Sequence, residues 1–326
     1  MKSFYTILSI LLIFSCSKTK DPIGPELMTP SSEFRIQEDF LPGINSIDFN
    51  SRSQYFVAYF NERVSWTITL IGEESGAKKV IKGVSKEINE ANSNWDGAQD
   101  GIIFFRNESV KAVLSFYGNT KTTECEFRIS RTKTYEGASL LGNGFENTFR
   151  EDSPLWGYSP YPSASYGSVV EFPVVQGNFA YMLSGKDTDN DYWICQLRRR
   201  YTQNQLPENP QDVWINVYVY GNGNNNSILK ISGKEDDFGN NNYNDARDDS
   251  WEHEVNLSHT GWKLVSVKYS NFIRSTVINY GGNGNKKQEP HKIRYIDFTL
   301  LASNPGGSGQ VVIDFPIITV EKPFKP

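Results

Sequence analysis

The sequence predicts an all-β protein in which two β-sandwiches follow one another along the chain. Over most of its 326 residues, short runs rich in Val, Ile, Phe, Tyr and Trp alternate with polar residues. This is the period-two pattern of half-buried strands. Gly, Asn and charged residues separate the runs, as turns do. No stretch holds a convincing 3.6-residue apolar period, so long helices are not expected.

The chain begins with the layout of an export signal. Lys2 precedes an apolar run from Tyr5 to Phe14, and Ser15 and Cys16 follow it. The run is too short to span a bilayer stably. Residues 1–15 are therefore predicted to be a signal peptide that directs export.

The end of this run resembles a bacterial lipoprotein signal, because Ile13, Phe14 and Ser15 stand directly before Cys16. The resemblance implies that Cys16 is lipidated and becomes the new N-terminus, although Phe14 departs from the usual small residue. The alternative is an ordinary signal peptide with an accidental cysteine. Ser17 stands where an Asp would favour the inner membrane, so we expect an outer-membrane lipoprotein exposed at the cell surface.

A tether and a first folded unit are expected next. Residues 16–33 begin with the lipidated Cys and are otherwise polar, with three prolines, which predicts a flexible tether. Residues 34–134 contain about seven short β-rich runs, a number typical of an Ig-like β-sandwich in roughly 100 residues. The clearest runs are 55–60, 64–70, 101–105, 110–116 and 124–130.

The second unit is predicted over residues 135–326. Its strands are longer and its loops more polar, and no helical stretch interrupts them. Antiparallel strands over such a length favour a jelly-roll β-sandwich. The strand runs are 192–197, 213–220, 227–231, 251–257, 262–267, 293–300 and 311–315.

Several short motifs occur in a fixed order in this second unit. They are Gly144-Phe145-Glu146, Trp156-Gly157-Tyr158, residues 179–185, residues 214–221, residues 261–267 and Ile313-Asp314-Phe315. Their order resembles carbohydrate-binding modules of the galactose-binding-like jelly-roll kind, over about residues 140–320. The resemblance implies the fold more firmly than the function, because this sandwich hosts many roles.

The same resemblance implies a structural calcium ion held by Glu146 and Asp314, the opening and closing acids of such modules. Calcium takes six to eight hard oxygen ligands, which carboxylates supply. The alternative is that both acids are exposed at strand ends. A further acidic run, 187–191, lacks the central Gly and distal Glu of an EF-hand and is interpreted as a polar turn. The Asp-rich stretches 235–237 and 245–249 are interpreted as a solvated loop.

A glycan-binding surface is predicted from aromatic residues. The segment Trp156 to Tyr161 is expected to be a loop with three aromatic residues, Trp156, Tyr158 and Tyr161, and two prolines near it stiffen the platform. Tyr166 and Trp251 are further candidates. The alternative for this loop is that Trp156 closes one end of the sandwich. The strand tryptophans at 193, 214 and 262 are expected in the core.

Several function classes find no support in the sequence. A net charge of −5 gives no basic face for nucleic acid. Three scattered histidines are too few for a zinc site, and the motifs of common hydrolases and phosphate-binding loops do not occur. Acid pairs are plentiful, as a two-carboxylate glycosidase requires, but acidic loops are also common on the surface of a sandwich. No enzymatic activity is predicted, and Cys125 and Cys195 are expected to be two separate buried thiols.

Two functions remain open from the sequence. In the first, the chain is a surface lipoprotein that binds glycan through its jelly roll, without catalysis. In the second, it is a structural or interaction subunit of an outer-membrane import or secretion complex. The Ig-like unit would then be a spacer or a docking surface.

Overall fold

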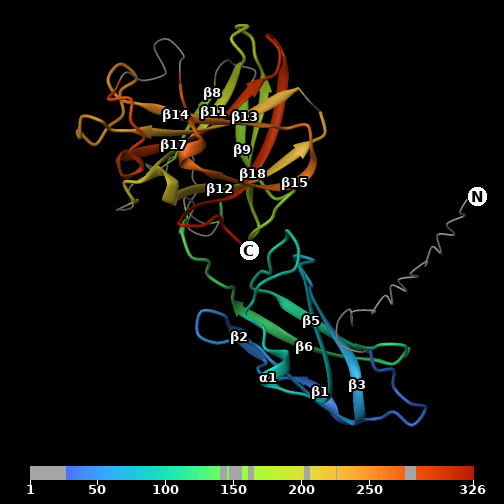
Figure 1. The fold of residues 1–326 in the computed structure, drawn as a ribbon. Coiled ribbons are helices and arrows are strands. Elements are labelled where there is room, and N and C mark those ends of the chain that lie inside the picture. The colour runs from blue at the N-terminus through green and yellow to red at the C-terminus, as the bar shows by residue number, and fades with distance from the viewer. Residues whose placement is uncertain are drawn as a thin grey trace, which may run out of the picture.

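The computed structural model describes residues 27–139, 145–146, 156–160, 165–201, 206–224, 226–275 and 284–326, with residues 138–139 and 156–160 described as backbone. The all-β prediction is confirmed: the strands form three six-stranded sheets in two successive β units. Figure 1 shows the first unit, from β1 to β6, below the second. Signal peptide, Cys16 and most of the tether lie outside the described residues.

The first unit is a single hydrogen-bonded sheet that encloses its own core. Its strands are β1 (Ile36–Pro42), β2 (Ser46–Asp48), β3 (Phe56–Gly72), β4 (Lys78–Ile88), β5 (Ser109–Phe116) and β6 (Thr122–Arg131), in the order β1-β3-β5-β6-β2 with β4 beside β3. The early part of β3 pairs with β1 and the late part with β5. The strand thus passes from one side of the core to the other. One short helix, α1 (Glu90–Ser93), lies in the loop after β4.

Aromatic side chains fill this first core. Trp66 and Trp95 are almost fully buried, and Phe34 packs edge-on against Phe116 with ring centroids 4.6 Å apart. Gly83 lies under Trp66, where a Cβ would be 2.2 Å from the indole, so only glycine fits. The predicted strand at 101–105 is wrong: this segment is irregular, because it leaves the sheet and carries Phe104 to the second unit.

The second unit is a sandwich of two sheets. The β18 sheet has the order β15-β12-β18-β10-β9, with β7 also on β18. It comprises β7 (Ala138–Ser139), β9 (Tyr166–Val170), β10 (Ala180–Lys186), β12 (Val213–Asn222), β15 (Thr260–Lys268) and β18 (Ser308–Val320). The β17 sheet has the order β16-β14-β13-β17-β11-β8. It comprises β8 (Trp156–Pro160), β11 (Trp193–Arg200), β13 (Ser227–Glu235), β14 (Ser250–Asn256), β16 (Ile273–Arg274) and β17 (Ile293–Ala302).

Short 3-10 segments join these strands: η1 (Pro210–Asp212), η2 (Tyr269–Asn271) and η3 (Pro290–Lys292). The core lies between the two sheets. Leu197, Ile231 and Phe298 enter it from the β17 sheet, and Val217 and Ile313 enter it from the β18 sheet. Because side chains alternate along a strand, the residues between these core positions form the outer faces of the sandwich.

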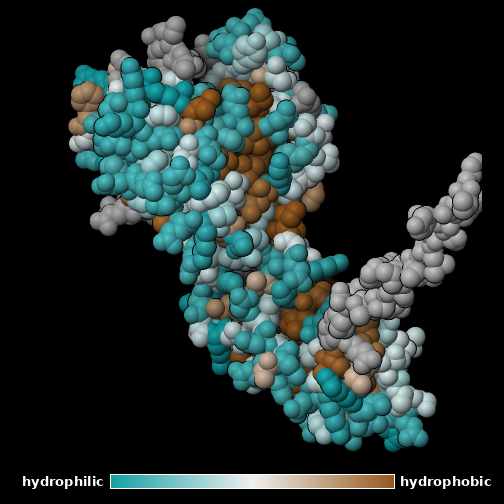
Figure 2. Space-filling view, viewed as in Figure 1, coloured by the Kyte–Doolittle hydropathy of each residue, from teal (hydrophilic) through white to brown (hydrophobic). Residues whose placement is uncertain are grey.

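The outer face of the β18 sheet is apolar. Ala180 and Val312 lie there beneath the half-buried Met182, Tyr220 and Trp262. Figure 2 shows this as a hydrophobic band over the region of β9 and β18. The core placement expected for the strand tryptophans is wrong, because those at 193, 214 and 262 are half-buried on outer faces.

The two units meet in an aromatic cluster. Phe104 of the first unit packs against Tyr135, Tyr218, Phe315 and Phe324, with ring centroids 5.2 to 6.4 Å apart. The backbone N–H of Phe104 also donates to the carbonyl of residue 175 at 2.9 Å. The units therefore share a packed junction as well as a covalent link.

Cys125 is half-buried in the first unit and Cys195 is buried in the second, and they are separate thiols. Burial raises the pKa of Cys125 to about 12. This thiol therefore stays protonated and unreactive at neutral pH. Within the described part of the chain, no helix is both long and apolar enough to cross a membrane.

Candidate functional site

The aromatic segment predicted as a loop is a strand. Residues Trp156 to Pro160 form β8, which pairs with β11 at the edge of the β17 sheet. Tyr158 lies opposite Leu197, a core residue. Since paired residues share a face, position 158 lies on the inner side of the sheet. Large and small residues alternate from Trp156 to Pro160, which is compatible with a strand. Pro is tolerated because this strand lies at a sheet edge. Tyr161 lies outside the described residues.

The other aromatic candidates lie elsewhere. Tyr166 begins β9 in the opposite sheet and is 49% exposed. Trp251 lies in β14, half-buried against the core, and its indole N–H donates to Glu235 Oε2 at 3.0 Å. Strands β14 and β8 are four strand spacings apart, roughly 19 Å. The structure therefore does not bring these residues together into one platform.

The outer face of the β17 sheet instead carries a row of polar side chains. Because Leu197, Phe298 and Ile231 point inward, their neighbours along the strands point outward. The row is formed by Gln196, Arg198, Lys230, Ser232, Glu252, Asp297 and Thr299, and the register places them side by side on four strands.

Asp297 is the centre of this row. Its side chain has no exposed area, and Arg198 donates to both of its oxygens, from Nε at 2.9 Å and from a terminal nitrogen at 2.8 Å. Lys234 Nζ lies 3.6 Å from Asp297. Burial works to lower the pKa of Arg198, but the hydrogen bonds and charge of Asp297 outweigh it and raise that pKa. The guanidinium is therefore permanently charged and held in one orientation.

Further contacts fix the neighbours of this pair. The Thr299 hydroxyl donates to Gln196 Oε1 at 3.2 Å, and Lys230 lies 3.2 Å from Glu252. Arg198 lies over the ring of Tyr295, 5.0 Å from its centroid. Side chains already held by neighbours lose little entropy when a ligand binds. The row is thus a preorganised polar surface.

Aromatic groups flank the row. Trp193 lies opposite Leu301 at one end of β17, and Tyr295 lies opposite Arg200 at the other. Positions 295 and 301 are separated by roughly 20 Å at about 3.4 Å per residue. At the Tyr295 end, the loop 236–249 reaches the face, where Tyr295 donates to Asn242 Oδ1 at 3.1 Å. The face is therefore long enough for an extended ligand.

Sequence reasoning missed this face, although a signal exists. Gln196 and Arg198 alternate with the apolar Cys195 and Leu197 in one strand, and Tyr295, Asp297 and Thr299 alternate with Ile296 and Phe298 in another. Such alternation marks a solvent-facing row. The decision that these strands are neighbours requires the sheet order, which the sequence does not contain.

The predicted calcium acids do lie against one segment, residues 174–179. Asp314 Oδ2 accepts the backbone N–H groups of Val175 at 2.7 Å and Gln176 at 3.0 Å. Glu146 Oε1 accepts those of Asn178 and, at 2.8 Å, Phe179. Burial raises the pKa of Asp314 to about 7, against these hydrogen bonds. The two carboxylates thus anchor a loop beside the junction of the units.

The N–H contacts of Glu146 and Asp314 compete with calcium for the same carboxylate oxygens. Each carboxylate oxygen has two lone pairs, and N–H groups fill both on Asp314 Oδ2 and on Glu146 Oε1. Among the described residues, the contacts of the two acids therefore suit loop anchoring, whereas calcium takes six to eight oxygens. Calcium binding at Glu146 and Asp314 stays a prediction. In the part of the chain that the structure describes, no group of three or more His, Cys, Asp or Glu side chains is arranged to hold a metal.

The Asp-rich stretches are not a solvated loop, so that prediction is wrong. Asp236, Asp248 and Asp249 are almost fully buried. Asp236 and Asp248 accept backbone N–H groups of their own loop, whereas Asp249 accepts those of Gly284 and Lys286 in another segment. Asp236, for example, accepts from Asn240 at 3.1 Å and Asn241 at 2.6 Å. Asp187 is likewise buried and accepts the N–H groups of Tyr192 and Gly306, so it organises a turn.

Comparisons with known proteins give distant similarities. A comparison with protein-family models finds no match, and one with curated proteins finds none either. Among solved structures, the chain is similar to the family 11 carbohydrate-binding module of the cellulosomal cellulase Lic26A-Cel5E of Clostridium thermocellum. The identity is 14%, with 58% of this chain and 97% of that chain covered and a TM-score of 0.44.

Two other carbohydrate-binding modules are similar at lower scores. One is the family 22 xylan-binding domain of Paenibacillus barcinonensis Xyn10C, at 15% identity, 58% and 99% coverage and a TM-score of 0.33. The other is a family 30 module, at 11% identity, 59% and 88% coverage and a TM-score of 0.37. All three neighbours are carbohydrate-binding modules. At these TM-scores, conclusions about function depend on the chain's own residues.

Proposed function

We propose that this chain is a cell-surface lipoprotein that binds a glycan on the outer face of the β17 sheet, without catalysing a reaction. The observation that carries the proposal is the row of fixed polar side chains around Asp297 and Arg198, with Trp193 and Tyr295 at its two ends. This replaces the aromatic loop as the main candidate surface.

The chemistry of the row matches that of sugars. A sugar hydroxyl both donates and accepts hydrogen bonds, and the partly exposed members of the row offer amide, guanidinium, ammonium and carboxylate groups side by side: Gln196, Arg198, Lys230 and Glu252. The CH face of a sugar ring packs against flat aromatic rings such as those of Trp193 and Tyr295. The side chains of the row are held in place before binding, so little entropy is lost when the ligand binds. A sugar, which has little apolar surface, can therefore be bound specifically.

The test is a titration of soluble glycans against the full chain by calorimetry, with mixed-linkage β-glucan, xylan and mannan as probes. We expect saturable binding of at least one of them. Gln196→Ala and Trp193→Ala should weaken it by about tenfold each, the effect of losing roughly 1.4 kcal/mol. Trp214→Ala, on the outer face of the other sheet, is the matched control and should leave the affinity unchanged.

Two outcomes would count against the proposal. One is that none of the probes binds. The other is that Trp214→Ala weakens binding as much as Trp193→Ala does. If none of the probes binds, the interaction-subunit hypothesis is favoured, and a pull-down from the cell envelope is the next measurement. An equal loss in Trp214→Ala would instead mean that the glycan does not bind on the β17 sheet face.

The anchor is tested separately. Cys16→Ala should release the protein from the membrane fraction, because the lipid on this residue is its proposed attachment. Protease treatment of intact cells should degrade the anchored wild type if it faces outward. Retention of the variant in the membrane fraction would rule out lipidation at Cys16 as the anchor.

A further inference from the structure

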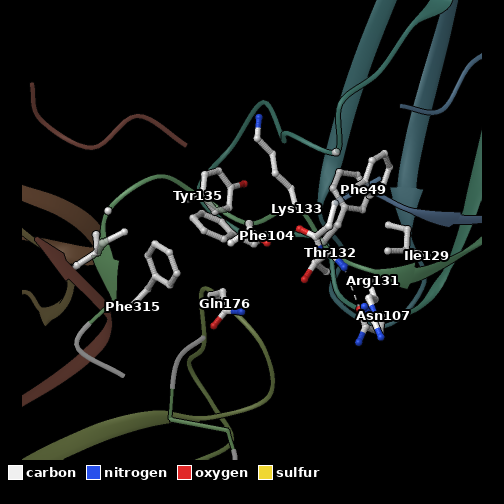
Figure 3. Close-up of a pocket in the computed structure, with 16 residues that line it drawn as sticks. Phe49, Phe104, Asn107, Ile129, Arg131, Thr132, Lys133, Tyr135, Gln176 and Phe315 are labelled. Atoms are coloured by element: carbon white, nitrogen blue, oxygen red, sulfur yellow. Dashed lines mark hydrogen bonds between the residues drawn. The ribbon is translucent and has the colours of Figure 1, made fainter. Parts of the chain in front are cut away.

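A cavity of about 350 Å³ lies at the junction of the two units. This volume is at the lower end of the range for small-molecule sites, which occur preferentially at interfaces between domains. Figure 3 shows Phe104, Tyr135, Phe315 and Gln176 on one side of the cavity and the first-unit residue Phe49 on the other. Both units therefore contribute to its walls.

One wall is aromatic and rigid. The ring of Phe104 lies 5.2 Å from that of Tyr135 and 5.2 Å from that of Phe315, measured between centroids. Tyr135 is further fixed by a 2.9 Å hydrogen bond to Gln99. A ligand with a flat apolar face can pack on this wall without disturbing it.

The cavity also contains an unsatisfied acceptor. Gln176 Oε1 is buried, and within the described residues it has no hydrogen-bond partner. A buried acceptor without a donor is unfavourable, because it has lost its hydrogen bonds to water. A ligand hydroxyl that donates to Gln176 would replace one of these hydrogen bonds. Asn50, Asn107 and Thr132 add polar groups to the lining.

The described lining is positively charged. It contains Arg131 and Lys133 and no carboxylate, although the whole chain carries a net charge of −5. Lys133 is paired with Asp96. The Arg131 side chain is 73% exposed, and its ion pair with Asp48 is long, at 3.8 Å. Arg131 is thus accessible to a second anion at the cavity.

We propose that this junction cavity binds a saccharide residue that carries a carboxylate, such as a uronate. The carboxylate pairs with Arg131, the ring lies on the wall of Phe104 and Tyr135, and a hydroxyl donates to Gln176 Oε1. This site is separate from the β17 sheet face. Its occupant holds the two units together, because each unit contributes part of the site.

The test is calorimetry on the full chain with three probes: D-glucuronate, D-glucose and benzoate. D-Glucuronate should bind saturably and about tenfold more tightly than either of the others, since one charge-assisted hydrogen bond separates it from glucose and the hydroxyls separate it from benzoate. Equal affinity for glucuronate and glucose would overturn the acidic specificity. Equal affinity for benzoate would overturn the saccharide assignment, and no glucuronate binding would overturn both.

Variants locate the site. Arg131→Ala and Gln176→Glu should each weaken glucuronate binding by about tenfold, the latter by placing a like charge beside the ligand. Arg128→Ala is the matched control, because Arg128 is exposed on the same strand and does not line the cavity. Circular dichroism checks that each variant is folded. If Gln196→Ala abolished glucuronate binding while Arg131→Ala did not, the ligand would belong to the β17 sheet face and the junction site would be disproved.

Discussion

The hydroxyl of Tyr269 donates a 2.9 Å hydrogen bond to Glu235 Oε1, and both side chains are fully buried. Glu235 accepts two further hydrogen bonds, from the Trp251 indole and from the backbone of Glu289. Burial nevertheless dominates and raises the pKa of Glu235 to about 8. The folded protein therefore binds a proton at this position that the unfolded chain releases near pH 4.5.

This pair predicts a pH dependence of stability. Between about pH 4.5 and 8 the native state binds more protons than the unfolded state, so stability falls as the pH rises through this window, by up to about 1.4 kcal/mol per unit. Glu235→Gln should make the free energy of unfolding less dependent on pH in this window. Urea unfolding at several pH values measures it; an unchanged slope in the variant would show that Glu235 is ionised in the native state.

Gly177 predicts a stability effect at the anchored loop. Its φ is +68°, and an added Cβ would lie 2.2 Å from Glu146 Oε1. Gly177→Ala should therefore cost about 1–3 kcal/mol, the sum of left-handed strain and a displaced carboxylate. Gly239 has the same φ with open space around it, so Gly239→Ala is the matched control. Equal losses in thermal unfolding would mean that the Glu146 contact contributes nothing.

The Arg198–Asp297 pair predicts strong coupling. Among the described cations, Arg198→Ala leaves the buried Asp297 with the more distant Lys234 alone, which should cost about 3–5 kcal/mol. The double variant Arg198→Ala/Asp297→Ala should recover part of that loss, because the unpaired charge is then gone. A double-mutant cycle in urea measures the coupling. Additive losses would show that the two residues act independently.

The anchored loop also predicts a response to calcium. If calcium binds at Glu146 and Asp314, it must displace N–H groups that these acids accept, and millimolar calcium should then raise the melting temperature relative to EGTA. Differential scanning calorimetry makes the comparison, and Asp314→Asn should abolish the increase. An unchanged melting temperature would show that the two acids only anchor the loop.

The sequence predicted the fold class better than the site. Alternating runs identified most strands, since burial of one face imposes period two. The run at 101–105 misled, because Phe104 is buried at the junction between units rather than within a sheet. The tryptophans at 193, 214 and 262 were expected in the core, but they lie half-buried on the outer faces of the sheets.

The site depends on contacts that are distant in the chain. Arg198 and Asp297 are 99 residues apart, and nothing in either local segment marks them as partners. Trp156 and Tyr158 were conspicuous because they cluster in sequence, yet their strand lies at a sheet edge. The acidic residues of 235–249 were predicted to be solvated, because charged side chains are usually exposed to water. Their burial depends on N–H groups of a loop whose conformation the sequence does not reveal.

The position of β18 has a consequence for how the molecule is made. It is the last of the described strands, yet it lies in the middle of its sheet, between β12 and β10. Phe324, shortly after it, completes the aromatic cluster and donates its N–H to Asn216 Oδ1 at 3.0 Å. The second sandwich therefore cannot close until β18 has left the ribosome, whereas the first unit has all its described strands once β6 has emerged. During synthesis the first unit can thus fold while the second sandwich is still open.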